Sequence, residues 1–243
     1  RLVGSEMCIR DSGPTLLYKT IAQNFNIKLD GYVEVGFDAV KAIVNAVGGV
    51  DIELTESEAA YLNATNYIRP AKYRNVKAGK HTLNGAQALG YSRIRKTAKG
   101  ITPVTPNGKM DDYGRTWRQR NVINAIFNKA KGTSLPKLMD LAQTILSKYV
   151  TTDLSSQDII GYMKDVVMMG TMEIYQLQIP MDNYFTTQRD YYAPGSTTNL
   201  GSVILPDMTA NTAALNDFIF KYKGTEGQEY TYTSGSGTTT PAQ

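Results

Sequence analysis

The stretch DGYVEVGFDAVKAIVNAVGGVDIEL, residues 30–54, predicts the class of the fold. Its segment YVEVGF alternates two sets of side chains, as a strand does. Asp38 can then cap a helix whose valine and isoleucine residues share one face, and the Gly48 and Gly49 pair ends that helix before a second strand at residues 50–54. A strand, a helix and a strand in this order predict a parallel pair of strands in a sheet with helices on its faces.

The length and composition indicate a soluble globular domain. The chain has 243 residues, of which 42% are hydrophobic and 20% are charged, which is enough for a sizeable core. Cys8 is the only cysteine, so an internal disulfide and a cysteine-based metal site are excluded. No apolar run approaches the roughly 18 residues of a membrane span, and the first residues lack the apolar segment of a signal peptide.

The two ends of the chain differ from the rest. Residues 1–12, RLVGSEMCIRDS, have no helical or strand periodicity and look like a translated sequencing-adapter scar, so we expect them to be non-native and disordered. Residues 223–243 are rich in glycine, threonine and serine and predict a disordered tail. The expected folded domain is therefore residues 13–222.

Periodicity predicts further helices and strands. The expected helices cover residues 15–26, 84–89, 135–149, 156–169 and 210–222. The expected strands cover residues 91–95, 172–179 and 202–205. Between them, residues 55–81 are polar and tyrosine-rich and predict a long excursion.

The expected strand at residues 91–95 carries two arginines on one face. With a period of two, Arg93 and Arg95 point to the same side and Ile94 points to the other. Their Cα atoms would be about 7 Å apart, so the two guanidinium groups could hold both halves of a pyrophosphate. The alternative is an edge strand that carries solubilising charges.

A helix is expected to begin within DDYGRTWRQRN, residues 111–121. The apolar residues from Val122 onward define one face, and at about 100° per residue Arg115 and Gln119 fall within that face. Arg118 falls at its edge. Because an unpaired guanidinium is costly to bury, we expect an anionic partner there. The ordinary alternative is a solvated amphipathic face.

Positive charge is concentrated around this helix. The formal net charge is +4 with an isoelectric point of about 8.9, and residues 91–120 alone contain eight Lys and Arg against Asp111 and Asp112. A local patch of this kind favours a phosphate-bearing or polyanionic partner, and a helix start adds backbone N–H groups for an anion. Asp112 could be a simple helix cap, or an ionised carboxylate that positions a cation or a nucleophile.

Three segments in this order resemble the LytR-CpsA-Psr family of bacterial cell-wall glycopolymer ligases. They are GGVDIEL at 48–54, GKHTLNGAQALGYSRIR at 79–95 and DDYGRTWRQRNVINAI at 111–126. The resemblance covers residues 13–222. It implies an α/β fold, a three-layer α/β/α sandwich with a mixed central sheet, and an apolar lipid-binding cavity for a polyprenyl chain with arginines at its mouth.

The resemblance also implies a function. Such enzymes move a glycopolymer of teichoic acid or capsule type from a polyprenyl-pyrophosphate carrier to peptidoglycan, with magnesium (Mg²⁺), at the extracellular face of the cell membrane. By motif position the expected pyrophosphate-binding residues are Arg93, Arg95, Arg115, Arg118 and Gln119. The expected catalytic residues are Asp112 and Arg115.

Two features depart from the family's pattern. The family's first strands, which bring further aspartates and an arginine to the site, and a membrane anchor before them would lie upstream of Gly13, so the main magnesium ligands are expected there. Residues 96–111 predict a flexible loop, longer than the few residues usual between the two motifs. We therefore expect this chain, expressed as given, to fold poorly or to lack activity with a lipid-pyrophosphate substrate.

A second hypothesis is a non-catalytic module that binds a polyanion, either wall polymer or nucleic acid, through the same patch. Nucleic-acid binding favours aromatic residues interleaved with the cations, and only Tyr91, Tyr113 and Trp117 are close. No nucleic-acid partner is therefore expected. The expected partners are a polyprenyl-pyrophosphate-linked glycopolymer, peptidoglycan and, through the anchor, the membrane.

Overall fold

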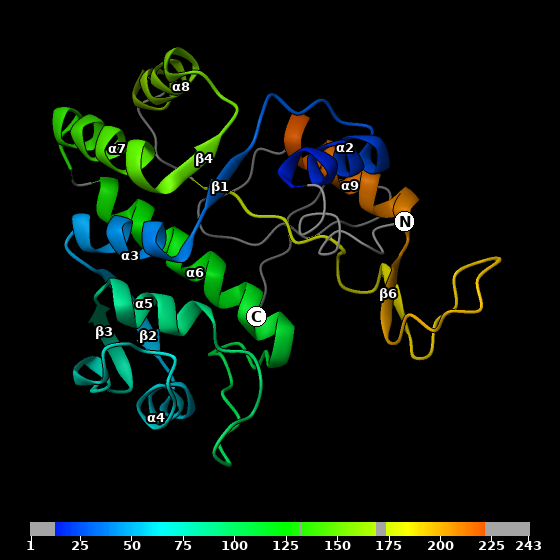
Figure 1. Ribbon diagram of the computed structural model, residues 1–243, viewed down its shortest axis with the longest axis horizontal. Helices are drawn as coiled ribbons and strands as arrows, with labels where there is room; N and C mark the ends of the chain where they lie inside the picture. Colours follow the sequence, from blue (N-terminus) through cyan, green and yellow to red (C-terminus); the bar gives the residue numbers. More distant parts are fainter. Residues whose placement is uncertain (1–12, 132, 169–173, 222–243) are drawn as a thin grey trace. The chain divides into compact units, whose positions relative to one another are not determined.

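The structure is a computed structural model that describes residues 13–131, 133–168 and 174–221 (Figure 1). The segments expected to be a scar and a tail, residues 1–12 and 223–243, lie outside the described residues.

The chain forms two compact units. One combines the described residues within 1–32 and 173–243, and the other consists of the described residues within 33–172. Helices and short antiparallel sheets occur in the described part of both units, which confirms the α/β class. The described strands form two-stranded antiparallel sheets, so the mixed central sheet, the three layers and the apolar cavity stay predictions.

The larger unit, residues 33–172, holds most of the helices. Its elements in chain order are β1 (Val33–Val35), α3 (Phe37–Ala46), β2 (Val50–Leu54), α4 (Glu56–Ala64), η1 (Ala71–Tyr73), β3 (Gly79–Leu83), α5 (Gly85–Ser92), α6 (Asp111–Lys131), α7 (Leu135–Tyr149), β4 (Val150–Thr152) and α8 (Ser156–Met168). Helices α7 and α8 confirm the expected helices in that region over the described residues.

Strand pairing in the larger unit differs from the expected parallel pair. β2 pairs antiparallel with β3, with Val50 opposite Leu83, and β1 pairs antiparallel with β4. The predicted parallel pairing of the two strands within residues 30–54 is therefore wrong. The physical reason is burial. All three side chains of β1 are exposed, whereas β2 alternates buried and exposed side chains and pairs with β3, whose Leu83 is buried opposite Val50.

Helix α3 lies directly against α5. It begins at Phe37, so Asp38 stands in the first turn instead of at the cap. A Cβ atom added to Gly85 at the start of α5 would lie 2.3 Å from the backbone oxygen of Lys41, and the Gly85 N–H donates to Asn45 Oδ1 at 2.8 Å. Only glycine permits this backbone approach.

The core of the larger unit joins β2, β3 and helices α3 to α6. Its most deeply buried members are Val44, Val50, Ile52, Leu54, Tyr61, Leu62, Ile68, Leu83, Ala88, Tyr91, Ile94 and Val122. Ile94 and Val122 belong to the two arginine-bearing segments. The core therefore fixes the backbone from which the arginines project.

The smaller unit contains α2 (Pro14–Phe25), β5 (Phe185–Gln188), β6 (Val203–Pro206) and α9 (Met208–Phe220), and β5 pairs antiparallel with β6. The helices expected near both ends of the domain and the strand expected at residues 202–205 are confirmed over the described residues. The strand expected at residues 172–179 is wrong over its described part, which forms only an isolated bridge position.

Candidate functional site

Helix α5 brings the first arginine to the site. It starts with a capping box, in which the Asn84 side chain accepts from the backbone N–H of Gln87 and the Gln87 side chain accepts from the backbone N–H of Asn84. The helix continues to Ser92 with Arg93 as its C-cap, so the predicted strand at residues 91–95 is wrong. The capping box fixes the start of the helix. Burial of residues up to Ser92 extends the helix into a segment whose sequence also alternates as a strand would.

Burial after the helix end follows the expected alternation. Arg93 and Arg95 are exposed, and Ile94 is fully buried. The guanidinium carbon of Arg93 lies 4.7 Å from the ring centre of Phe37 and 5.7 Å from that of Tyr67. Stacking uses the face of a guanidinium group and leaves the N–H groups in its plane for an anion.

Arg95 and Arg115 meet at one carboxylate. Asp112 Oδ1 lies 3.3 Å from Arg95 Nε and 2.6 Å from Arg115 Nη2, and Arg95 Nη2 donates to Asp112 Oδ2 at 3.4 Å. The side chains of Arg95 and Asp112 are about half exposed. Two cations from different segments therefore converge at the surface on the acid that the sequence singled out.

Helix α6 sets the position of this carboxylate. The helix begins at Asp111, so Asp112 lies in its first turn. Among the described residues, Asp112 Oδ1 and Arg115 Nε are the buried side-chain polar atoms without a hydrogen bond, although Asp112 Oδ1 keeps its ionic contacts. The Arg115 Nε–H therefore has a hydrogen bond to offer to an anion. Gln119 is exposed four residues further on, on the same face.

Arg118 lies inside the protein instead of at the surface. Its side chain is fully buried, and its Nε donates to Glu58 Oε1 at 2.7 Å. Its two remaining nitrogens donate to backbone oxygens, that of Ile94 at 3.3 Å and that of Pro103 at 3.1 Å. The structure thus does not bring Arg118 together with the exposed arginines, although sequence analysis grouped it with them as a pyrophosphate ligand.

The buried face of α6 is rotated from the expected one. The buried residues include Gly114, Arg118 and Val122, whereas Ile123 and Phe127 are 49% and 38% exposed. The helical pattern predicted the wrong face because Arg118, a charged residue, was counted as polar although it is buried. We expected an anionic partner for a buried guanidinium group. That partner is Glu58 of the same chain, and the guanidinium group is that of Arg118.

Glu58 is the structural residue that sequence analysis missed. It is fully buried in the first turn of α4, where Glu58 Oε2 accepts from the backbone N–H of Thr55 at 3.0 Å and Thr55 Oγ1 accepts from the backbone N–H of Glu58. The spacing T-x-x-E was a visible signal for a helix start. No local pattern could identify its partner Arg118, which lies sixty residues later.

Tyr91 packs near this ion pair. Burial raises the pKa of its hydroxyl, whose oxygen accepts from Asn121 Nδ2 at 3.2 Å. The Glu58 carboxylate raises the pKa further. The phenol therefore stays neutral at neutral pH and adds no charge beside the ion pair.

The described residues do not form a magnesium site on their own. No group of three or more His, Cys, Asp and Glu side chains comes together among them, and Asp112 is already in contact with two arginines. Magnesium remains a prediction from the family resemblance. When bound, it would act as a Lewis acid toward phosphoryl oxygens.

The fold and the cluster together define an α/β protein with arginines gathered at the start of a helix. A comparison with family models identifies the group. The chain belongs to the LytR_cpsA_psr family, whose model matches residues 7–203.

Characterised relatives are similar over part of their length. The chain is 34% identical over 148 residues to the polyisoprenyl-teichoic acid–peptidoglycan teichoic acid transferase TagU of Enterococcus faecalis, covering 60% of this chain and 41% of that protein. It is 27% identical over 186 residues to the transferase TagV of Bacillus subtilis, which has the same functional name, covering 76% and 44%. The chain thus spans less than half of each relative.

A solved structure described as TagT bound to LIIa-WTA has a related fold. It matches with a TM-score of 0.50 at 26% sequence identity, over 66% of this chain and 54% of that chain.

Proposed function

We propose that this chain is part of a phosphotransferase that moves a glycopolymer of teichoic acid or capsule type from a polyprenyl-pyrophosphate carrier to peptidoglycan. Membership of the family and the names of the relatives support this class of reaction. The observation that carries the proposal is the convergence of Arg95 and Arg115 on Asp112, with the ring-stacked Arg93 two residues earlier. Two cations share one carboxylate and Arg93 is two residues from Arg95, which leaves positive charge for a diphosphate.

The reaction develops charge that these arginines can stabilise. A sugar hydroxyl of the acceptor attacks the phosphorus that carries the polymer. A phosphorus–oxygen bond to the acceptor forms, the bond to the bridging oxygen breaks, polyprenyl phosphate leaves and the hydroxyl proton is released. Negative charge then builds on the phosphoryl and bridging oxygens, where preorganised cations lower its energy.

Each residue has a distinct part in this proposal. Arg95 and Arg115 contact the phosphoryl oxygens, with the Nε–H of Arg115 as an additional donor. Arg93 and Gln119 bind the second phosphate. Asp112 occupies Arg95 and Arg115 until the phosphates of the substrate displace it. Arg118 acts indirectly, through the backbone oxygens that it binds.

The carrier and the acceptor place the proposed reaction at the extracellular face of the cell membrane. Ile123 and Phe127 expose apolar side chains further along α6, which supports contact with a prenyl chain. No helix in the described part of the chain combines the length and the apolar character that a membrane crossing requires.

Binding of geranylgeranyl pyrophosphate to the purified chain tests the proposal. We expect saturable binding that falls at least about tenfold in Arg95→Ala and in Arg115→Ala, because each substitution removes a charge-assisted contact. Arg189→Ala is the matched control, since Arg189 is exposed in the smaller unit. Unchanged lipid binding in both site variants would remove these residues from the site. Preferential binding of DNA with a steep salt dependence would favour the polyanion-binding module instead.

A further inference from the structure

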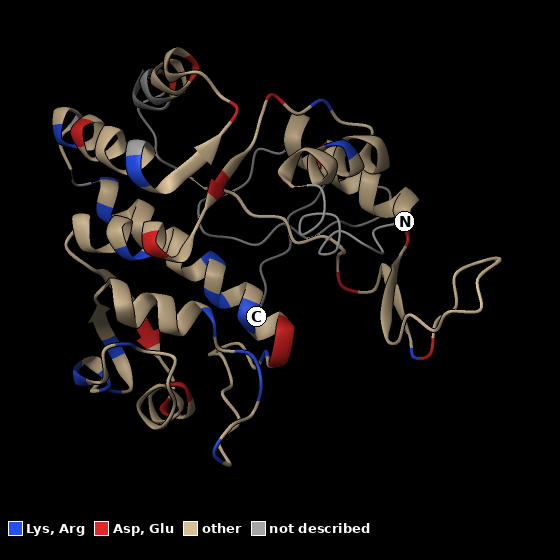
Figure 2. Cartoon of the chain, viewed as in Figure 1, with Lys and Arg blue, Asp and Glu red and all other residues tan. Residues whose placement is uncertain are grey.

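Residues 96–110, here called the basic arm, leave the arginine cluster and return to the start of α6. The arm follows directly after Arg95 and ends beside Asp111 (Figure 1). Its side chains include three lysines, and Figure 2 shows basic segments along it. The proposed function assigns no role to these lysines.

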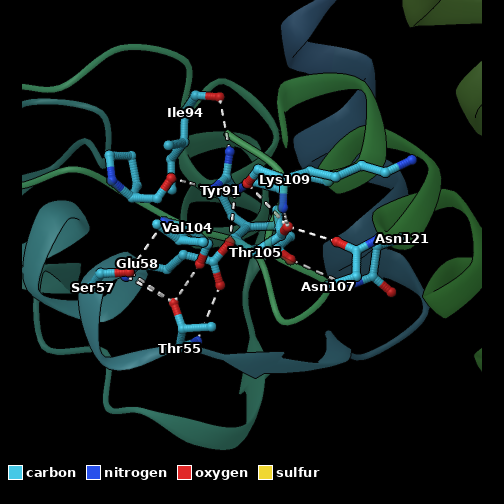
Figure 3. Close-up of polar contacts among 12 residues, drawn as sticks. Thr55, Ser57, Glu58, Tyr91, Ile94, Val104, Thr105, Asn107, Lys109 and Asn121 are labelled. Atoms are coloured by element: carbon cyan, nitrogen blue, oxygen red, sulfur yellow. Dashed lines mark hydrogen bonds and ion pairs between the residues drawn. The ribbon is translucent and has the colours of Figure 1, made fainter. Parts of the chain in front are cut away.

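Hydrogen bonds hold the middle of the arm in place. Pro103 O accepts from the buried Arg118. Val104 O accepts from Thr55 Oγ1 at 2.8 Å, and the Val104 N–H donates to Ser57 Oγ at 3.1 Å (Figure 3). The predicted flexible loop is therefore fastened to both α4 and α6. Side chains on a fixed backbone lose less entropy when they bind a partner.

The outer part of the arm is a tight turn. Ala98 and Ile101 form an antiparallel bridge, Thr97 Oγ1 and Thr102 Oγ1 lie 2.9 Å apart in a hydrogen bond, and Lys99 at the turn has a left-handed backbone with φ 54°. Lys99 is exposed at this turn.

Two lysines of the arm lie outside the ion pairs of the described residues. Lys96 and Lys99 are exposed, and neither forms an ion pair with any residue that the structure describes. The neighbouring Arg95 shares its one carboxylate, Asp112, with Arg115. The positive charges of Arg95, Lys96 and Lys99 lie within five residues and repel one another, so an anionic partner would relieve the repulsion.

The arm joins the start of α6, whereas the exposed apolar residues of that helix come after its arginines. Ile123 and Phe127 stand toward the C-terminal end of that helix, with Phe127 about 18 Å of helix rise beyond Arg115. The arm joins the N-terminal end, and Lys99 can lie at most about 14 Å from the Cα atom of Arg95. Along the chain the basic arm comes first, the arginine cluster lies beside it, and the exposed apolar residues of α6 follow. A substrate with an anionic chain, a diphosphate and a lipid has its groups in the same order.

We propose that Lys96 and Lys99 bind phosphate groups of the polymer itself, beyond the pyrophosphate, so that the arm selects a phosphate-bearing glycopolymer over an uncharged one. This inference rests on the proposed function, because it places the polymer at the arm only if the diphosphate sits at Arg95 and Arg115.

The experiment compares the unmodified chain with the double variant Lys96→Ala/Lys99→Ala. Binding is measured by fluorescence anisotropy with poly(glycerol phosphate), dextran, geranylgeranyl pyrophosphate and single-stranded DNA, at about 50 mM and about 300 mM salt. We expect a loss of about 3- to 10-fold for poly(glycerol phosphate) at low salt and a shallower salt dependence. The affinity for geranylgeranyl pyrophosphate should change by less than about twofold, since neither lysine belongs to the cluster.

The control is Lys77→Ala/Lys80→Ala, which removes two exposed lysines at and next to β3. Equal losses in both double variants, an unchanged affinity for the polymer, or equal losses for polymer and lipid would each overturn the arm's role. DNA binding tighter than polymer binding and equally sensitive to the arm would overturn the choice of partner. If the unmodified chain binds polymer through the arm but does not bind the lipid, the proposed function fails while the arm's anion binding stands.

Discussion

Asp112 holds two arginines that come from different segments of the chain. Its carboxylate contacts Arg95 Nε at 3.3 Å and Arg115 Nη2 at 2.6 Å, in a half-exposed position. Ion pairs of this exposure contribute only about 0–1 kcal/mol each. A diphosphate carries more charge and more acceptor oxygens than one carboxylate, so it can compete successfully for the same guanidinium groups.

The first prediction concerns this competition. Asp112→Asn should raise the affinity for inorganic pyrophosphate by about 3- to 10-fold at low salt, because it removes an anion that occupies the two arginines. The gain should shrink as salt screens the charges. Isothermal titration calorimetry measures both effects. Asp38→Asn is the control, since Asp38 pairs with Lys41 on α3. A loss of affinity in Asp112→Asn would mean that the carboxylate instead orients the arginines for binding.

Individual residues were predictable where local spacing decides their exposure. Arg93 and Arg95 are exposed and Ile94 is buried, as the alternation indicated, although a helix end produces it instead of a strand. Arg118 was not predictable, because its burial depends on Glu58 from a distant helix. A helical wheel ranks residues by type and contains no information about a distant counterion.

At the scale of elements, one buried ion pair joins helix α4 to helix α6 and to the basic arm. Glu58 and Arg118 are both fully buried, and Arg118 also binds the backbone oxygens of Ile94 and Pro103. Replacing a buried pair by apolar residues is often nearly neutral, but leaving one charge alone is costly. The effect of a substitution should therefore depend on whether both partners change.

Glu58→Gln should lower the free energy of unfolding by about 3–5 kcal/mol, because it leaves the Arg118 guanidinium buried without a counterion. The amide oxygen can still accept from the backbone N–H of Thr55, so the helix cap is retained. Urea unfolding measures the change. The double variant Glu58→Leu/Arg118→Met should lose less unfolding free energy than the single variants Glu58→Leu and Arg118→Met lose together. A loss below about 1 kcal/mol in Glu58→Gln would contradict this account.

Helices could be predicted from the sequence more fully than sheet pairing. Caps and periodicity located α2, α3, α7, α8 and α9 within a few residues, because these signals lie inside each helix. Strand partners depend on distant residues, so β3 was taken for part of an excursion and the pairing of β1 with β4 was missed. The two arginine segments could be located because one follows the end of α5 and the other lies near the start of α6, and these helix boundaries have local signals.

At the scale of the whole molecule, burial is uneven. The larger unit has one core around β2 and β3, whose register runs from Val50 opposite Leu83 to Leu54 opposite Gly79. The other two described sheets are also two-stranded, and the side chains of β1 are all exposed. A two-stranded sheet without a covering core is marginally stable.

Hydrogen exchange should reveal this difference. We expect amides of β2 and β3 to exchange at least about tenfold more slowly than those of β1 and β4, because only the former open together with the core. Peptide-level deuterium exchange with mass spectrometry measures the rates, and β5 with β6 provides a second sheet in which no side chain is buried. Equal protection of all three sheets would show that exposure of these strands does not set their stability.

The capping box of α5 has a consequence for how the chain tolerates changes of length. The box sets where the helix starts, and Arg93 is delivered where it ends. Each residue added to a helix turns everything after it by about 100° and shifts it by about 1.5 Å. One inserted or deleted residue anywhere in α5 would therefore swing Arg93 away from Phe37 and Tyr67. The length of α5 therefore fixes the direction in which Arg93 leaves the helix.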